Sequence, residues 1–140
     1  MKKIHFRILV IVSFFLSIFG GFADLIISDP IVNQITEFAE SIEPEWSDAK
    51  LFTILGFVIL WIIYIIYTFV GLLLFWNIAR HIYLAGFIII IPMYFIVGVT
   101  VTSGIEQALY DAGSVLSGVL LALIYFSPVK QFFVGKSNRN

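Results

Sequence analysis

Hydrophobic positions fall into four long blocks along the chain, and polar segments separate them. The approximate limits of the blocks are residues 6–27, 51–76, 82–101 and 104–127. A helix of about 20 apolar residues crosses the ~30 Å hydrocarbon core of a bilayer. The pattern therefore predicts an all-α integral membrane protein, built as a bundle of four membrane-spanning helices.

Local signals refine the limits of these predicted spans. The second block would be about 39 Å long at helical rise, so we expect it to tilt or to project from the bilayer. Residues 77–81 are expected to form the turn that follows it. Pro92 removes a backbone hydrogen bond near the middle of the third block and predicts a kink there. Ser103 and Glu106 have the spacing of a capping box, which predicts a helix start near Gly104.

The polar segment between the first two blocks has a helical periodicity of its own. Asp29 and Pro30 have the order of an N-cap and a first helical residue. From there to Ile42, apolar residues recur on one helical face and polar residues fill the other. This pattern predicts a short external amphipathic helix over residues 30–42, lying on the membrane or capping the bundle.

Composition supports the membrane interpretation. Of the 140 residues, 61% are hydrophobic and 12% are charged, and a soluble domain of this size could not bury so much apolar surface. The length allows a single membrane domain and no separate soluble one. The chain contains no cysteine, which excludes disulfides, thiolate metal sites and dithiol redox couples.

The net charge of -1 conceals a strong separation of charge along the chain. All nine acids lie at the first or third connection: Asp24, Asp29, Glu37, Glu40, Glu43, Glu45, Asp48, Glu106 and Asp111. Seven of the eight bases fall on the opposite side: Lys2, Lys3, Arg7, Arg80, Lys130, Lys136 and Arg139. By the positive-inside rule both termini are cytoplasmic, and residues 128–140 form a basic cytoplasmic tail.

The segment before the first block is basic, which is typical of a signal peptide as well as of a membrane anchor. Gly21, Phe22 and Ala23 have the small-x-small order of a cleavage site. The apolar stretch continues beyond them, through Leu25 to Ile27, so we expect this helix to be retained.

Small residues recur at every fourth position in two of the blocks. They are Ser13, Ser17 and Gly21 in the first block, and Ser114, Gly118 and Ala122 in the last. Such stripes let helix backbones approach closely in lipid. The favoured interpretation is that the first and last helices pack against each other within the monomer, and the alternative makes one of the stripes an interface to another subunit. Replacing Gly118 with leucine should then disturb packing more than the same change at Gly135.

The second block has one face of aromatic and hydroxyl character. Its members are Phe57, Trp61, Tyr64, Thr68 and Gly71. In lipid, tyrosine and tryptophan need partners for their polar atoms, so packing within the chain is the favoured interpretation. A groove for a lipid tail, a quinone or a partner helix is the alternative.

Two acids, Glu106 and Asp111, belong to the last block. If its helix begins near Gly104, both lie in the outer interfacial layer, where water reaches them. The alternatives are a cation-attracting mouth formed with Asp24, or proton coupling. None of the blocks has an ionisable residue near its midplane, which argues against transport by a monomer.

Candidate chemistry is sparse. His5 and His81 lie near cytoplasmic ends of spans, where contact with headgroups or a cytoplasmic partner is favoured over haem ligation. No nucleophile, base and acid share a helical face, and no phosphate-binding loop or zinc motif is present. The basic tail suits anionic lipid better than nucleic acid. We therefore expect no enzymatic activity, no cofactor and no metal.

Residues 121–130 contain the run Tyr-Phe-Ser-Pro-Val-Lys, and Phe133 follows it. This run, together with residues 76–80, resembles segments of small uncharacterised four-helix inner-membrane proteins of bacteria. The resemblance implies a bacterial inner membrane and supplies no activity.

Three classes of function remain open. The favoured class is a non-enzymatic accessory or interaction protein, either a small subunit of a membrane complex or an immunity-type protein. The second is a homo-oligomeric cation channel or carrier, whose acidic outer face would concentrate cations. The third is a lipid- or quinone-handling enzyme that uses the aromatic face. The expected partners are the bilayer and another membrane protein or a second copy of the chain.

Overall fold

The computed structural model describes residues 2–26, 30–42, 48–97 and 101–134. Every regular element in these ranges is a helix, which confirms the all-α prediction. In chain order the helices are α1 (Lys3–Ile26), α2 (Pro30–Ile42), α3 (Asp48–Leu73), α4 (Asn77–Val97), α5 (Gly104–Phe126) and α6 (Lys130–Phe133).

Three of these helices are long and apolar enough to cross a membrane. The stretches that qualify are Lys3–Ala23 in α1, Leu51–Leu73 in α3 and Gly104–Phe126 in α5. The apolar part of α4 is shorter, Asn77–Pro92, so the fourth crossing stays a prediction. Pro92 lies inside α4, and its kink stays a prediction too.

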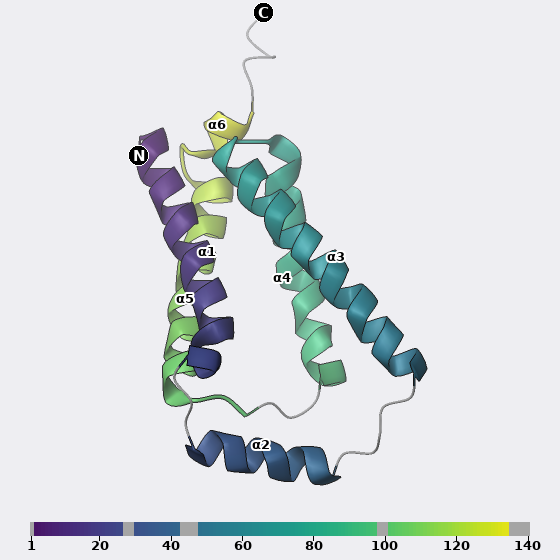
Figure 1. The fold of residues 1–140 in the computed structure, drawn as a ribbon. Coiled ribbons are helices and arrows are strands. Elements are labelled where there is room, and N and C mark those ends of the chain that lie inside the picture. The colour runs from purple at the N-terminus through teal and green to yellow at the C-terminus, as the bar shows by residue number, and fades with distance from the viewer. Residues whose placement is uncertain (1, 27–29, 43–47, 98–100, 135–140) are drawn as a thin grey trace, which may run out of the picture.

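The long helices form two antiparallel pairs, α1 with α5 and α3 with α4 (Figure 1). The N-terminus, α6 and the connection between α3 and α4 lie at one end of the molecule, where α1 also contacts α3. We call this the closed end. Toward the other end α3 diverges from α1, and α2 lies across that end.

The buried core lies at the closed end. Its members are Phe6, Val10, Leu72, Phe75, Ala79, Tyr83, Leu120, Ile124, Val129 and Phe133. The Phe6 ring lies 5.5 Å from the ring of Phe75 and 5.7 Å from that of Phe133, between ring centroids. Tilted and edge-on pairs of this kind are favourable beyond the area they bury. The closed end is therefore the part of the bundle that side-chain packing fixes best.

The end of α3 differs from the expected limit at residue 76. The amide of Trp76 donates to the carbonyl of Gly71 over 2.8 Å, and the amide of Phe75 donates to Leu72 over 3.3 Å. These bonds and the left-handed φ of 59° at Phe75 make a Schellman cap. The turn therefore lies before Asn77, and the segment 77–81, expected to be a turn, is the first part of α4.

Helix α5 begins at Gly104, where the capping-box spacing places it. Ser103 is the N-cap, and its hydroxyl accepts a hydrogen bond from the amide of Glu106 over 3.2 Å. That bond satisfies one of the amides that have no partner within a first helical turn. Glu106 also places a negative charge in that turn, where the helix dipole favours it.

The segment after α5 folds back onto the core. The Ser127 hydroxyl donates to the carbonyl of Leu123 over 2.6 Å and accepts from the amide of Val129 over 3.1 Å. This joins the end of α5 to α6, whose Phe133 is only 3% exposed. Phe133 lies in the protein core, because α6 turns it toward Phe6.

Helix α2 presents apolar side chains that the protein does not cover. Ile31, Ile35 and Phe38 are all exposed, although they share the apolar face of the helix. Its limits are those that the periodicity predicts. Its position outside the membrane stays a prediction.

Candidate functional site

Close contact between α1 and α5 depends on small residues of both helices. The Ser13 and Ser117 hydroxyl oxygens are 3.0 Å apart, and Ser13 is buried. A Cβ added at Gly113 would lie 2.9 Å from the Ser17 hydroxyl oxygen, so only glycine fits there without a shift. One added at Gly21 would lie 3.3 Å from the Tyr110 hydroxyl oxygen. The predicted stripe of the first block therefore lies along α5.

The predicted stripe of the last block does not take part in this contact. Ser114, Gly118 and Ala122 are exposed, and a Cβ at Gly118 would meet no atom within 4 Å. The face of α5 that contacts α1 contains Gly113 and Ser117, which are displaced by one residue, or about 100° around the helix. The first and last membrane helices therefore pack against each other as expected, but α5 uses the face of Gly113 and Ser117 instead of the predicted stripe.

Neighbouring residues explain why the sequence pointed to the wrong face. Gly113 and Ser117 also have a four-residue spacing, so α5 carries two small-residue stripes side by side. The buried residues Leu120 and Ile124 continue the first of them. Because these side chains are large, a pattern of small residues alone does not include this face. A pattern that combines small residues with leucine and isoleucine on the same face would have identified it.

Tyr64 and Gly71 of the aromatic face of α3 contact α4, whereas the ring stacks of Phe57 and Trp61 lie within α3. Trp61 stacks on Tyr64 with 4.9 Å between ring centroids, and Phe57 stacks on Trp61 at 6.0 Å. The Tyr64 hydroxyl donates to the carbonyl of Tyr83 in α4 over 3.3 Å. The interaction satisfies a phenolic hydroxyl within an apolar region. This geometry supports the interpretation as internal packing.

Thr68 and Gly71, near the C-terminal end of that face, are buried more deeply. The buried Thr68 hydroxyl donates to the carbonyl of Tyr64, one turn earlier in α3, over 2.6 Å. A Cβ added at Gly71 would overlap the Cβ of Ala79 in α4. A bound molecule could not occupy this part of the face without separating the two helices.

The acidic positions of the predicted mouth are only partly described. Asp111 is exposed, and its Oδ1 accepts a hydrogen bond from the side-chain Nε2 of Gln107 over 2.9 Å. Glu106 is half-buried in the first turn of α5. The side chain of Asp24 lies outside the described residues. The assembly of these acids into one site therefore stays a prediction.

The two histidines are both exposed. His81 contacts its neighbours: its Nε2 lies 3.2 Å from Arg80 Nε, and its Nδ1 lies 3.3 Å from the Tyr125 hydroxyl. That hydroxyl also lies 3.1 Å from the carbonyl oxygen of Arg80. These contacts tie the beginning of α4 to the end of α5, a role that the sequence did not suggest. Within the described residues, no group of three or more His, Cys, Asp or Glu could hold a metal ion.

Comparisons with protein-family models, curated proteins and solved structures give no match. The class follows from the helices themselves. Because α1, α3 and α5 are each long and apolar enough to cross a bilayer, the chain is a multi-pass helical membrane protein.

Proposed function

We propose that this chain is a non-enzymatic accessory protein of the bacterial inner membrane, which packs one face of α5 against a membrane helix of a partner. The open space beside Gly118 carries the proposal. Ser114 and Ala122 are exposed on the same face, one turn before and after it. In lipid, small residues at this spacing let a second helix approach closely and gain dispersion contacts. The stripe is free for such a partner because α1 uses the neighbouring face.

The proposal includes four membrane crossings with both termini in the cytoplasm. The ends of the helices support it, since the N-terminus, α6 and the connection between α3 and α4 lie together (Figure 1). The basic residues Lys3, Arg7 and Arg80 also belong to this end, where each lies over an aromatic ring of the core region. The positive-inside rule then assigns the closed end to the cytoplasm.

Helix α2 would lie on the outer membrane surface in this arrangement. Its exposed apolar residues Ile31, Ile35 and Phe38 support that position, because an interfacial helix buries such a face in the headgroup region. Its polar face would then contribute to the acidic outer surface.

Native mass spectrometry of the chain, extracted gently from its own membrane, tests the proposal. The Gly118→Leu variant fills the proposed interface. Gly56→Leu is its matched control, because a Cβ at Gly56 in α3 also meets no atom within 4 Å. We expect the wild-type chain and Gly56→Leu to carry a second polypeptide and Gly118→Leu to lose it. A wild-type chain without any associated polypeptide, or a Gly118→Leu variant that retains it, would contradict the proposal.

A homo-oligomeric mass would favour the cation channel or carrier instead. Planar-bilayer recordings of the wild-type chain, Glu106→Gln and Asp111→Asn would then measure cation conductance and its selectivity. Recordings that stay silent across salts and pH values would leave a homo-oligomeric interaction protein.

A further inference from the structure

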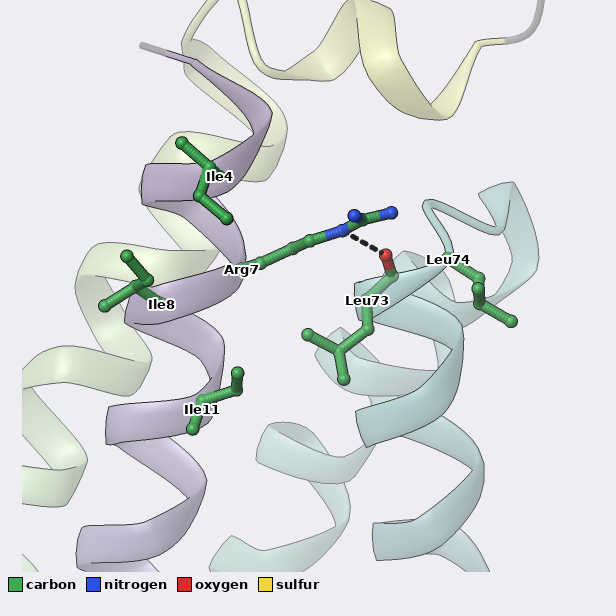
Figure 2. Close-up of a pocket in the computed structure, with 6 residues that line it drawn as sticks. All are labelled: Ile4, Arg7, Ile8, Ile11, Leu73 and Leu74. Carbon is green, nitrogen blue, oxygen red and sulfur yellow. Dashed lines mark hydrogen bonds between the residues drawn. The ribbon is translucent and has the colours of Figure 1, made fainter.

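A groove lies between α1 and α3 at the closed end (Figure 2). It is an open groove with a volume of about 370 Å³, and it is lined by Ile4, Arg7, Ile8, Ile11, Leu73 and Leu74. Five of these six side chains are aliphatic. The isoleucines Ile4, Ile8 and Ile11 lie along one side of α1 and are each more than a third exposed. The walls of the groove are therefore suited to a hydrocarbon chain.

Arg7 crosses this groove from one helix to the other. Its Nε donates to the carbonyl of Leu73 over 3.0 Å, and the remaining guanidinium nitrogens extend past that bond toward α3 (Figure 2). A guanidinium has five N–H donors, and this contact uses one of them. In the described part of the chain no carboxylate pairs with Arg7. Its outer edge is consequently available to an anion.

Arg7 and Lys3 place two cations beside one aromatic ring. Arg7 lies over the Phe75 ring with its Cζ 5.4 Å from the centroid, and the Lys3 ammonium lies 5.5 Å from the same centroid. Residues 1–23 contain no acid, and neither do residues 49–105. Both walls of the groove are thus free of negative charge, and an anion beside Arg7 would also be attracted by the Lys3 ammonium near the same ring.

We propose that this groove binds one anionic phospholipid, with its phosphate on Arg7 and Lys3 and one acyl chain along Ile8 and Ile11. Arginine binds phosphate through two parallel charge-assisted hydrogen bonds, which fixes the headgroup as well as attracting it. The aliphatic walls favour a lipid over a free phosphate, because only a lipid has an acyl chain that can pack against them. The inference does not depend on a protein partner or on the orientation of the chain.

The test is a lipid titration of the purified full-length chain in detergent, read by native mass spectrometry. Phosphatidylglycerol is compared with phosphatidylcholine of the same acyl chains, and inorganic phosphate is the third probe. We expect one bound phosphatidylglycerol that outlasts phosphatidylcholine in the gas phase and raises the Tm of the chain. Phosphate alone should leave the Tm unchanged.

Two variants and two matched controls locate the site. Arg7→Gln should weaken phosphatidylglycerol binding about tenfold or more, as expected for the loss of a hydrogen-bonded charge. Ile8→Trp keeps Arg7 but fills the groove, and should weaken the binding of both phosphatidylglycerol and phosphatidylcholine. Lys130→Gln removes one charge from α6 at the same end, and Val115→Trp adds an indole to an exposed position of α5; neither should weaken phosphatidylglycerol binding as much.

Three results would overturn the inference. Equal retention of the two lipids by the wild-type chain would remove the role of the anionic headgroup. Equal losses in Arg7→Gln and Lys130→Gln would show that the summed surface charge attracts lipid without a specific site. Stabilisation by inorganic phosphate equal to that by phosphatidylglycerol would show that the aliphatic walls contribute nothing.

Discussion

The Ser13 hydroxyl of α1 and the Ser117 hydroxyl of α5 lie 3.0 Å apart in the middle of the most extensive helix contact of the chain. The Tyr83 hydroxyl of α4 points toward this pair and makes no hydrogen bond of good geometry to either serine. Three polar groups from three helices therefore converge, and two of them, Ser13 and Tyr83, are buried within the protein. Such a cluster favours one register of α1 against α5, since a shift would leave hydroxyls without partners.

A double-mutant cycle of Ser13→Ala and Ser117→Ala should reveal the coupling. We expect a coupling free energy of about 0.6 kcal/mol, the average for hydrogen bonds between membrane helices. Reversible unfolding in mixed micelles provides the measurement. Ser114→Ala, on the exposed face of α5, is the control and should not couple to Ser13. Additive effects at Ser13 and Ser117 would mean that each hydroxyl finds another partner when its neighbour is removed.

Leucine at Gly113 and leucine at Gly118 should affect the stability of the isolated chain very differently. Gly113 faces the Ser17 backbone and hydroxyl, so Gly113→Leu should lower the free energy of unfolding by about 1–3 kcal/mol through overpacking. Gly118→Leu should change it by less than about 0.5 kcal/mol, because its side chain enters open space. Thermal unfolding in detergent distinguishes them. A large loss of unfolding free energy in Gly118→Leu alone would mean that the face of Gly118, and not that of Gly113, packs against α1.

Phe75 combines a left-handed backbone with a ring that packs in the core. Removing the ring should destabilise the chain by roughly 3 kcal/mol. Glycine adopts the φ of 59° at Phe75 more easily than alanine does. Phe75→Gly should therefore be more stable than Phe75→Ala by about 1 kcal/mol, the reverse of the usual helical order. Unfolding curves of the two variants that coincide would show that α3 ends differently once the ring is absent.

Phe133 and Phe126 offer a matched comparison near the C-terminal end. Phe133 is 3% exposed and Phe126 is 92% exposed. Phe133→Ala should lower the free energy of unfolding by about 3 kcal/mol, whereas Phe126→Ala should change it by less than about 0.5 kcal/mol. Tryptophan fluorescence during thermal unfolding reports both. Similar losses would mean that α6 does not hold Phe133 in the core in solution.

The sequence predicted helices well where a local signal decides them. Long apolar runs predicted the three candidate spans. Ser103 predicted the start of α5, because an N-cap side chain bonds to the first turn of the helix that follows it. The order of Asp29 and Pro30 in the sequence likewise predicted a helix start at Pro30, where α2 begins. The end of α3 was harder to predict, because Phe75 occupies the left-handed position at which a helix usually has glycine.

Contacts between distant segments were beyond a local reading of the sequence. The face of α5 that meets α1 depends on Leu120 and Ile124, which are ordinary lipid-facing residues in a membrane helix until a partner covers them. The burial of Phe133 depends on the direction in which α6 turns after Ser127. The groove beside Arg7 likewise requires that α1 and α3 lie next to each other at the closed end, which charge sorting alone does not specify.

The contact between Phe6 and Phe133 also has a consequence for biosynthesis. A ribosome makes Phe6 long before Phe133, and the delay is on the order of ten seconds at usual translation rates. The N-terminal helix therefore enters the membrane without the residues that will finally cover its buried side. During that interval lipid or the insertion machinery has to shield it, and the core can close only after the segment that contains Phe133 has been made.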